Sequence, residues 1–230
     1  MKHPFWTDIL AIQGEINVKG HKKEEFLSLV VQGFYPISHF SYFSFNLFAN
    51  LAGEANAKST ARFIAEVENG AHPLLGNAPY KGIPHCELLN ICIASLINKK
   101  EGFQIKNPES FQFFTNMKNM KLNEVEALAF CNEIEETAPM VINNYQDFVA
   151  KWQYLNKIPS AAIQRVYLDE HNLTEGSDFE DQHIQMIGKM NSPYLEEMKS
   201  STYSGAIETL RTNANLHLDE IYGEMQLLLN

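Results

Sequence analysis

The chain has 230 residues, of which 45% are hydrophobic and 20% charged, and its formal net charge is −10. This length suits one large domain or two small ones and can bury a sizeable core. The acidic balance argues against a nucleic acid partner, because phosphate binding needs clustered Lys and Arg.

The three cysteines, Cys86, Cys92 and Cys131, lie within or beside apolar runs, and no CxxC spacing occurs. An odd number of cysteines argues against a full disulfide framework, so buried reduced thiols in a cytoplasmic protein are expected. The first seventeen residues contain Asp8 and Glu15 and no long apolar core, unlike a signal peptide. No apolar run approaches the ~20 residues of a membrane span, so no membrane association is expected.

Helical spacing of apolar residues is common along the chain, and alternating β-branched runs between tight turns are missing. Loops rich in Gly, Pro and Asn fall at 70–84 and 99–108. The second helix should bend near Pro36. We therefore predict a single all-α domain spanning 1–230. Its expected helices are 4–17, 22–50, 57–71, 85–98, 109–115, 122–154, 159–174, 178–191 and 199–229.

Helix faces identify acids that should point into the core. Glu68 shares its face with Ile64 and Ala65, whereas Glu66 lies beside Arg62 and Asn69. We therefore expect Glu68 to point inward and Glu66 outward. A buried carboxylate needs a partner, and a metal ion is one such partner. The alternative is that Glu68 lies in the last, frayed turn of its helix.

His85 opens an apolar helix, in line with Leu88, Leu89 and Cys92, and should face the core from the first turn. It is a candidate ligand, although a hydrogen-bonded core histidine would show the same pattern. His72, four residues after Glu68, is an alternative candidate for the same ligand position.

In "LNEVEALAFCNEIEETAP", Glu135 shares a face with Leu128, Cys131 and Ile142, whereas Glu133 and its other acidic neighbours have more polar surroundings. Glu135 is therefore predicted to be the buried acid of this helix. Pro139 suggests a kink close to it.

The stretch "YLDEHNLTEGSDFEDQH" holds two histidines and five acids. His171 and Glu175 are four residues apart and share a face. "SDFE" matches a capping box that starts a new helix at Asp178, on which Glu180 and His183 share a face. The alternative for Asp178 and Glu180 is favourable charge at a helix N-terminus, and for His183 a solvated side chain.

Carboxylates and imidazoles from several helices thus converge in an all-α chain, which is how di-iron carboxylate sites are built. Mixed oxygen and nitrogen donors suit iron or manganese better than zinc.

Several short motifs then resemble the heme-oxygenase-like fold superfamily, in its branch of pyrroloquinoline-quinone-synthase-like and Chlamydia death-domain-associating-protein-like proteins, which includes di-iron oxidases. The motifs are "HPFWTDILAIQGEI", "FLSLVVQGFYPISHF", "AEVENGAH…HCELL", "EETAP" and "YLDEH…H". The resemblance spans most of the chain and implies a heme-oxygenase-like helical bundle.

The resemblance implies Glu68, His85, Glu135 and His171 as iron ligands, with further ligands completing a site for two irons. This sequence departs from the family pattern H-x-x-x-D-x-x-H. An alignment without gaps places Glu175 and Asp178 at the last two ligand positions. An alignment that keeps the last histidine instead places Glu175 or Glu180 together with His183 there. One iron, or none, is the alternative outcome.

The implied activity is oxidation of a small organic substrate by O2 at a non-heme iron site, in a protein that forms a homodimer. Four alternatives remain. The first is a non-catalytic interaction or ligand-binding protein with this fold, and the second is a thiaminase II-like hydrolase with Cys131 as nucleophile. The third is cofactorless oxidation like that of the quinone synthase, which the acidic residues fit poorly, and the fourth is heme binding through His21 or His39.

Overall fold

A computed structural model describes residues 3–19, 22–71, 81–170 and 178–230, and within these ranges the chain forms helices and no strand. The prediction of a single all-α bundle is confirmed. The α-helices are α1 (Phe5–Lys19), α2 (Lys23–Leu51), α3 (Ala55–Glu68), α4 (His85–Ser95), α5 (Gln112–Lys118), α6 (Glu124–Asn156), α7 (Val166–Glu170), α8 (Asp178–Asn191) and α9 (Ser201–Leu227). Short 3-10 turns are η2 (Pro108–Ser110), η3 (Ser160–Ala162), η4 (Ser192–Tyr194) and η5 (Glu197–Lys199).

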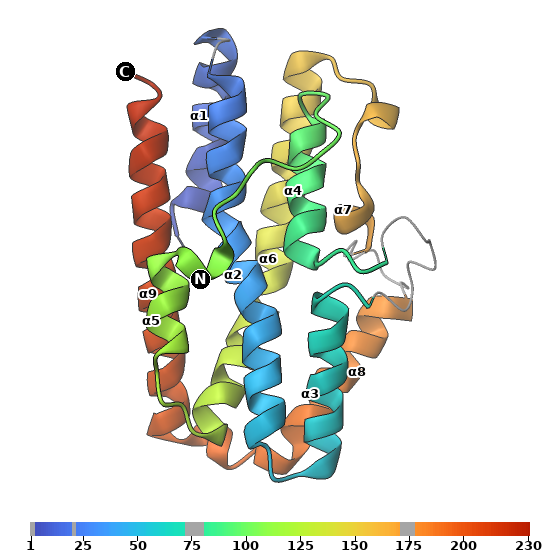
Figure 1. Ribbon diagram of the computed structural model, residues 1–230, viewed down its shortest axis with the longest axis vertical. Helices are drawn as coiled ribbons and strands as arrows, with labels where there is room; N and C mark the ends of the chain where they lie inside the picture. The colour runs from blue at the N-terminus through green and yellow to red at the C-terminus, as the bar shows by residue number, and fades with distance from the viewer. Residues whose placement is uncertain (1–2, 20–21, 72–80, 171–177) are drawn as a thin grey trace.

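The long helix α2 is the centre of the bundle and packs against α3, α4, α6 and α9. Figure 1 shows α3 and α4 stacked nearly end to end along one side of α2, with α3 below and α4 above. The helix α6 runs antiparallel to α2 behind them, and α9 and α5 cover the opposite side. The junction between α3 and α4 therefore lies at mid-height of the bundle.

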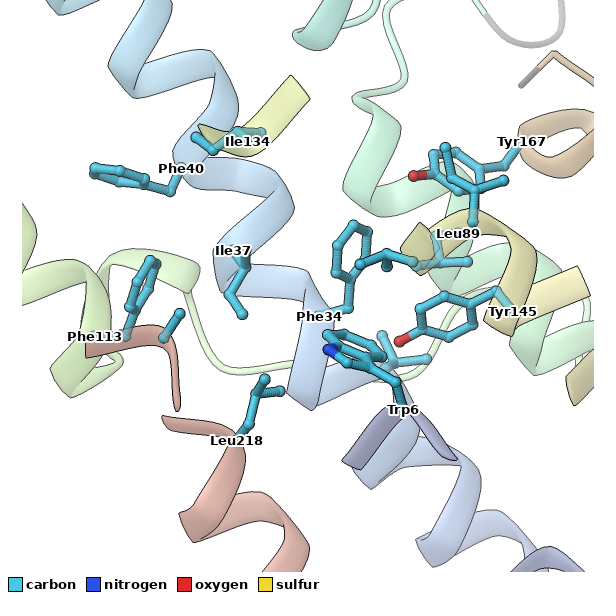
Figure 2. Close-up of a cluster of buried hydrophobic side chains, with 14 of the residues drawn as sticks. Trp6, Phe34, Ile37, Phe40, Leu89, Phe113, Ile134, Tyr145, Tyr167 and Leu218 are labelled. Carbon is cyan, nitrogen blue, oxygen red and sulfur yellow. The ribbon is translucent and has the colours of Figure 1, made fainter. Parts of the chain in front are cut away.

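Aromatic side chains fill the core on either side of α2, as Figure 2 shows for Trp6 and Tyr145 on one side and Phe113 on the other. The Trp6 ring meets the Phe34 ring and the Tyr145 ring edge-on, with ring centroids 6.0 Å apart in each pair. The Phe34 and Tyr145 rings also contact each other in a tilted arrangement. Phe40 is fully buried between α5 and α6. The aromatic stripe of α2 is thus mainly core.

Helix boundaries follow the local capping chemistry. Asn123 and Glu126 form a complete capping box at the start of α6. Lys157 ends the same helix in the left-handed conformation, with φ 53°. The Ser200 hydroxyl accepts the main-chain N–H of Tyr203 at the start of α9. The predicted helix boundaries at 178 and 191 agree with α8, and most others lie within three residues.

The predicted single helix 159–174 is wrong. The chain instead makes the turn η3, an extended stretch around Ile163 and the short helix α7. The Ser95 hydroxyl accepts the main-chain N–H of Gln164 at 3.0 Å, so this N–H is unavailable to a continuous helix.

All three cysteines are free and buried, as predicted. Among the helices that the structure describes, none combines the length and the apolar character needed to cross a bilayer.

Candidate metal centre

Two of the predicted ligands meet where α3 ends and α4 begins. The Nδ1 atom of His85 lies 3.2 Å from Oε2 of Glu68, and their side chains are only 5% and 12% exposed. Glu66, two residues earlier on α3, is exposed. The predicted inward orientation of Glu68 and burial of His85 are confirmed.

Backbone geometry at Gly70 holds this junction together. Gly70 has φ +104°, and a Cβ there would lie 2.6 Å from the carbonyl carbon of Gly82. The Gly82 N–H donates to the Gly70 carbonyl at 2.9 Å. Only glycine allows this close approach, which brings the end of α3 beside the chain entering α4.

A hydrogen-bonded network surrounds the first turn of α4. The Tyr35 hydroxyl on α2 donates to Glu87 at 3.0 Å. The amide of Asn90 donates to the Phe103 carbonyl, and its oxygen accepts the Phe103 N–H.

Burial raises the pKa of the Cys86 thiol to about 12, a hydrogen bond from Tyr35 opposes this, and the Glu87 and Glu68 carboxylates raise it further. Cys86 is therefore a neutral thiol beside Glu68.

Tyr167 of α7 covers the other side of His85. The two rings meet edge-on with centroids 6.0 Å apart, and Tyr167 is buried. Figure 2 shows Tyr167 beside Leu89 of α4. The imidazole is thereby held between α3, α4 and α7.

Glu135 comes from α6. Burial raises the pKa of the Cys131 thiol well above its usual value, a hydrogen bond with Ser44 opposes this, and the Glu135 carboxylate raises it further. Glu135 therefore lies close to Cys131, near the point where α6 meets α2.

Helix register places Glu135 near the level of the Glu68–His85 pair. Tyr145 donates to the Val30 carbonyl and Cys131 pairs with Ser44, which fixes α6 antiparallel to α2. In that register Glu135 lies opposite Phe40. The Tyr35–Glu87 bond puts His85 opposite Ile37. The two levels differ by three residues, or about 4.5 Å along α2.

The prediction that Glu135 is the buried acid of α6 and that Glu133 is not needs correction. Glu135 is half-buried, whereas the Glu133 side chain is fully buried. Arg211 of α9 makes two bonds of 2.8 Å to the Glu133 carboxylate. The polar neighbours of Glu133 in sequence indicated an exposed face, but α9 covers that face and supplies the compensating charge.

The remaining predicted ligands are described less fully. His72, His171 and Glu175 lie outside the described residues. Asp178, Glu180 and His183 lie in the first turns of α8, for which the description covers the backbone alone. The described part of α8 begins at Asp178, where the sequence predicts the helix to start. The described side chains bring Glu68 and His85 together and contain no group of three or more metal-binding side chains.

The Glu68–His85 pair fits a metal ion. With metal–ligand bonds of about 2.0–2.2 Å, neighbouring ligands at roughly a right angle lie about 3 Å apart, close to the observed 3.2 Å. One carboxylate and one imidazole suit iron or manganese. Without a metal, the same contact is a hydrogen bond that the imidazole donates to the carboxylate.

Cys131 is unsuited to the hydrolase alternative. Its side chain is fully buried and its raised pKa keeps the thiol protonated at neutral pH, whereas a nucleophile must be accessible and ionised. His39, named for heme binding, is half-buried against the rings of Tyr42 and Phe114.

Sequence reasoning overlooked the serines of α2. Ser38, Ser41 and Ser44 are all buried, in the otherwise aromatic run "ISHFSYFSF". Their spacing of three residues puts small polar groups on the inner side of the helix, and this spacing was visible in the sequence.

We compared the chain with known protein families, with curated proteins and with solved structures, and none of the three comparisons gave a match.

Proposed function

We propose that this protein is a non-heme iron enzyme that uses O2 to oxidise a small organic substrate. The observation that carries the proposal is the buried contact between Glu68 and His85, at 3.2 Å, contributed by two helices that end at mid-height of the bundle. The motif resemblance to the heme-oxygenase-like di-iron oxidases supports the same proposal independently.

In this proposal Glu68, His85 and Glu135 hold iron together with His171 and with Glu175, His183 or their neighbours in 171–183. Bound ferrous iron would supply the site for O2 and the electrons that reduce it. Two irons are expected if the 171–183 segment completes the second position, and one if it does not.

The chain's own residues would prepare this site. The buried His85 is fixed between Glu68 and the Tyr167 ring, so its imidazole has little rotational freedom. The neutral Cys86 and Cys131 thiols add no charge beside the carboxylates. A bound cation would compensate the negative charges of Glu68 and Glu135, so metal loading should stabilise the fold.

Metal quantification tests the proposal. The purified protein is loaded anaerobically with ferrous iron, freed of unbound metal and assayed for iron. Glu68→Gln, Glu135→Gln and His171→Ala should each lose bound iron. The matched controls are Glu66→Gln, exposed and two residues from Glu68, and Glu136→Gln, exposed and next to Glu135. Both controls should keep wild-type stoichiometry.

The outcomes separate the alternatives. Nearly two irons per chain support a di-iron site and justify a substrate search that follows O2 consumption. About one iron supports a mono-iron site. No iron above background, in protein whose circular dichroism is that of a folded helical bundle, would refute the proposal and leave the interaction-protein alternative.

A further inference from the structure

Among the residues that the structure describes, the buried Ser41 hydroxyl on α2 has no hydrogen-bond partner. Ser41 is 3% exposed, and its Oγ contacts no donor or acceptor within the described part of the chain. Leaving a buried hydroxyl unpaired costs roughly 1–3 kcal/mol. The group therefore needs a reason to be there.

Three other hydroxyls in these helices donate to a carbonyl of their own helix. Ser44 donates to the Ser41 carbonyl at 2.9 Å, Ser95 to that of Cys92 at 2.6 Å, and Thr137 to that of Glu133 at 2.8 Å. Ser41 makes no such bond, although a helical serine can donate to a carbonyl three or four residues back. Its hydroxyl is therefore not satisfied by its own helix.

The direction of Ser41 follows from two fixed points on α2. Ser44 lies on the face of α2 that points toward α6, because it makes a hydrogen bond with Cys131. Tyr35 lies on the face that points toward α4, because it donates to Glu87. At about 100° per residue, Tyr35 lies about 180° around the helix from Ser44. Measured about the α2 axis from Ser44 toward Tyr35, Ser41 lies at about 60° and Ser38 at about 120°. Both residues therefore lie on the part of the α2 surface between α6 and α4.

The level of Ser41 also matches the candidate metal centre. In the register set by Ser44 and Cys131, Ser41 lies opposite Ile134, next to Glu135. Figure 2 shows Ile134 of α6 beside this part of α2. On the α4 side, Ser38 lies one residue below Ile37, the level of His85. Ser38 and Ser41 thus lie between Glu135 of α6 and the α3–α4 junction.

We propose that the Ser41 hydroxyl is a ligand-binding group, which donates a hydrogen bond to an acceptor atom of the small molecule bound beside the metal. This inference rests on the proposed function. The ligand class is a small anion, or a carbonyl or carboxylate group of the substrate, because these groups accept the hydrogen bond that a serine hydroxyl can donate. Binding would give the Ser41 hydroxyl a hydrogen-bond acceptor.

Azide binding and thermal stability test this inference. Azide is titrated into the oxidised, iron-loaded protein, its dissociation constant is read from the iron–azide absorbance, and the melting temperature of the metal-free protein is measured alongside. Ser41→Ala should weaken azide binding about five- to tenfold, the equivalent of one hydrogen bond. The same change should raise the melting temperature by about 2–4 °C, because an unsatisfied polar group is removed.

Ser44→Ala is the matched control, since Ser44 lies one turn away on α2, is equally buried and already has an acceptor. It should leave azide affinity unchanged and should not raise the melting temperature. Equal azide affinity in wild type and Ser41→Ala, or equal weakening in both variants, would overturn the inference while iron binding preserved the proposed function. Wild-type protein that binds no iron would overturn both.

Discussion

The imidazole of His217 on α9 donates from Nε2 to the main-chain carbonyl of Gln32 on α2, at 3.0 Å. In a regular helix the N–H four residues later would occupy that carbonyl, but residue 36 is a proline and has no N–H. A side chain from the other end of the sequence thus replaces the missing bond and lets α2 continue through Pro36. Because a carbonyl only accepts, the proton of neutral His217 must sit on Nε2.

Replacing His217 by leucine should therefore leave the Gln32 carbonyl buried without a donor and lower the free energy of unfolding by about 2 kcal/mol. Combining it with Pro36→Ala should recover part of that loss, because the alanine N–H can bond to Gln32. Urea unfolding of the two single variants and the double variant measures this coupling. Strictly additive losses would contradict the compensation.

His217 also makes stability depend on pH. Burial lowers its pKa, while the Gln32 and Gly33 carbonyls and Glu220 act in the opposite sense. Its folded-state pKa is thus below the unfolded value of about 6.5, so the unfolded chain binds more protons as pH falls. The stabilisation by neutral His217 is complete above about pH 6.5 and is lost as pH falls through the folded-state pKa.

The difference in unfolding free energy between wild type and His217→Gln should accordingly shrink from about pH 7.5 to about pH 5. Glutamine keeps a donor for the carbonyl and removes the titration. Urea unfolding at a series of pH values provides the measurement, and a difference that stays constant over this range would be inconsistent with a buried neutral imidazole.

The ion pair between Arg211 and Glu133 should be the most sensitive charged contact in the bundle core. Arg211→Ala leaves the fully buried Glu133 carboxylate without its guanidinium and should cost about 3 kcal/mol of unfolding free energy. Arg62→Ala, an exposed arginine on α3, serves as the control and should change stability by less than about 0.5 kcal/mol. Similar melting temperatures for the two variants would show that the pair contributes little.

Gly70→Ala should disrupt the junction between α3 and α4. The required φ of +104° and the close approach of Gly82 make any side chain strained there, at a cost of at least about 2 kcal/mol. Because Glu68 lies two residues before this glycine, we also expect the variant to lose bound iron. Gly223→Ala, on α9 with no atom within 4 Å of the added Cβ, should instead gain up to about 1 kcal/mol. Thermal melts and iron assays of both variants check this contrast.

Local patterns in the sequence determined the helices and the orientation of some acids. The spacing of apolar residues predicted a helix at 122–154, and both ends of α6 lie within two residues of that prediction. Glu68 and Glu66 were correctly assigned to opposite faces because helical period alone separates them. The burial of His85 followed from the same argument.

Only the tertiary structure decided which polar groups are satisfied, because their partners are remote in sequence. Arg211 reaches Glu133 from 78 residues away and made it, rather than Glu135, the fully buried acid of α6. Ser95 interrupts the predicted helix 159–174 by accepting the N–H of Gln164. His217 completes α2 at Pro36 from 185 residues away. Helical period and capping are local and can be read along the chain, whereas hydrogen-bond partners across helices depend on how those helices pack.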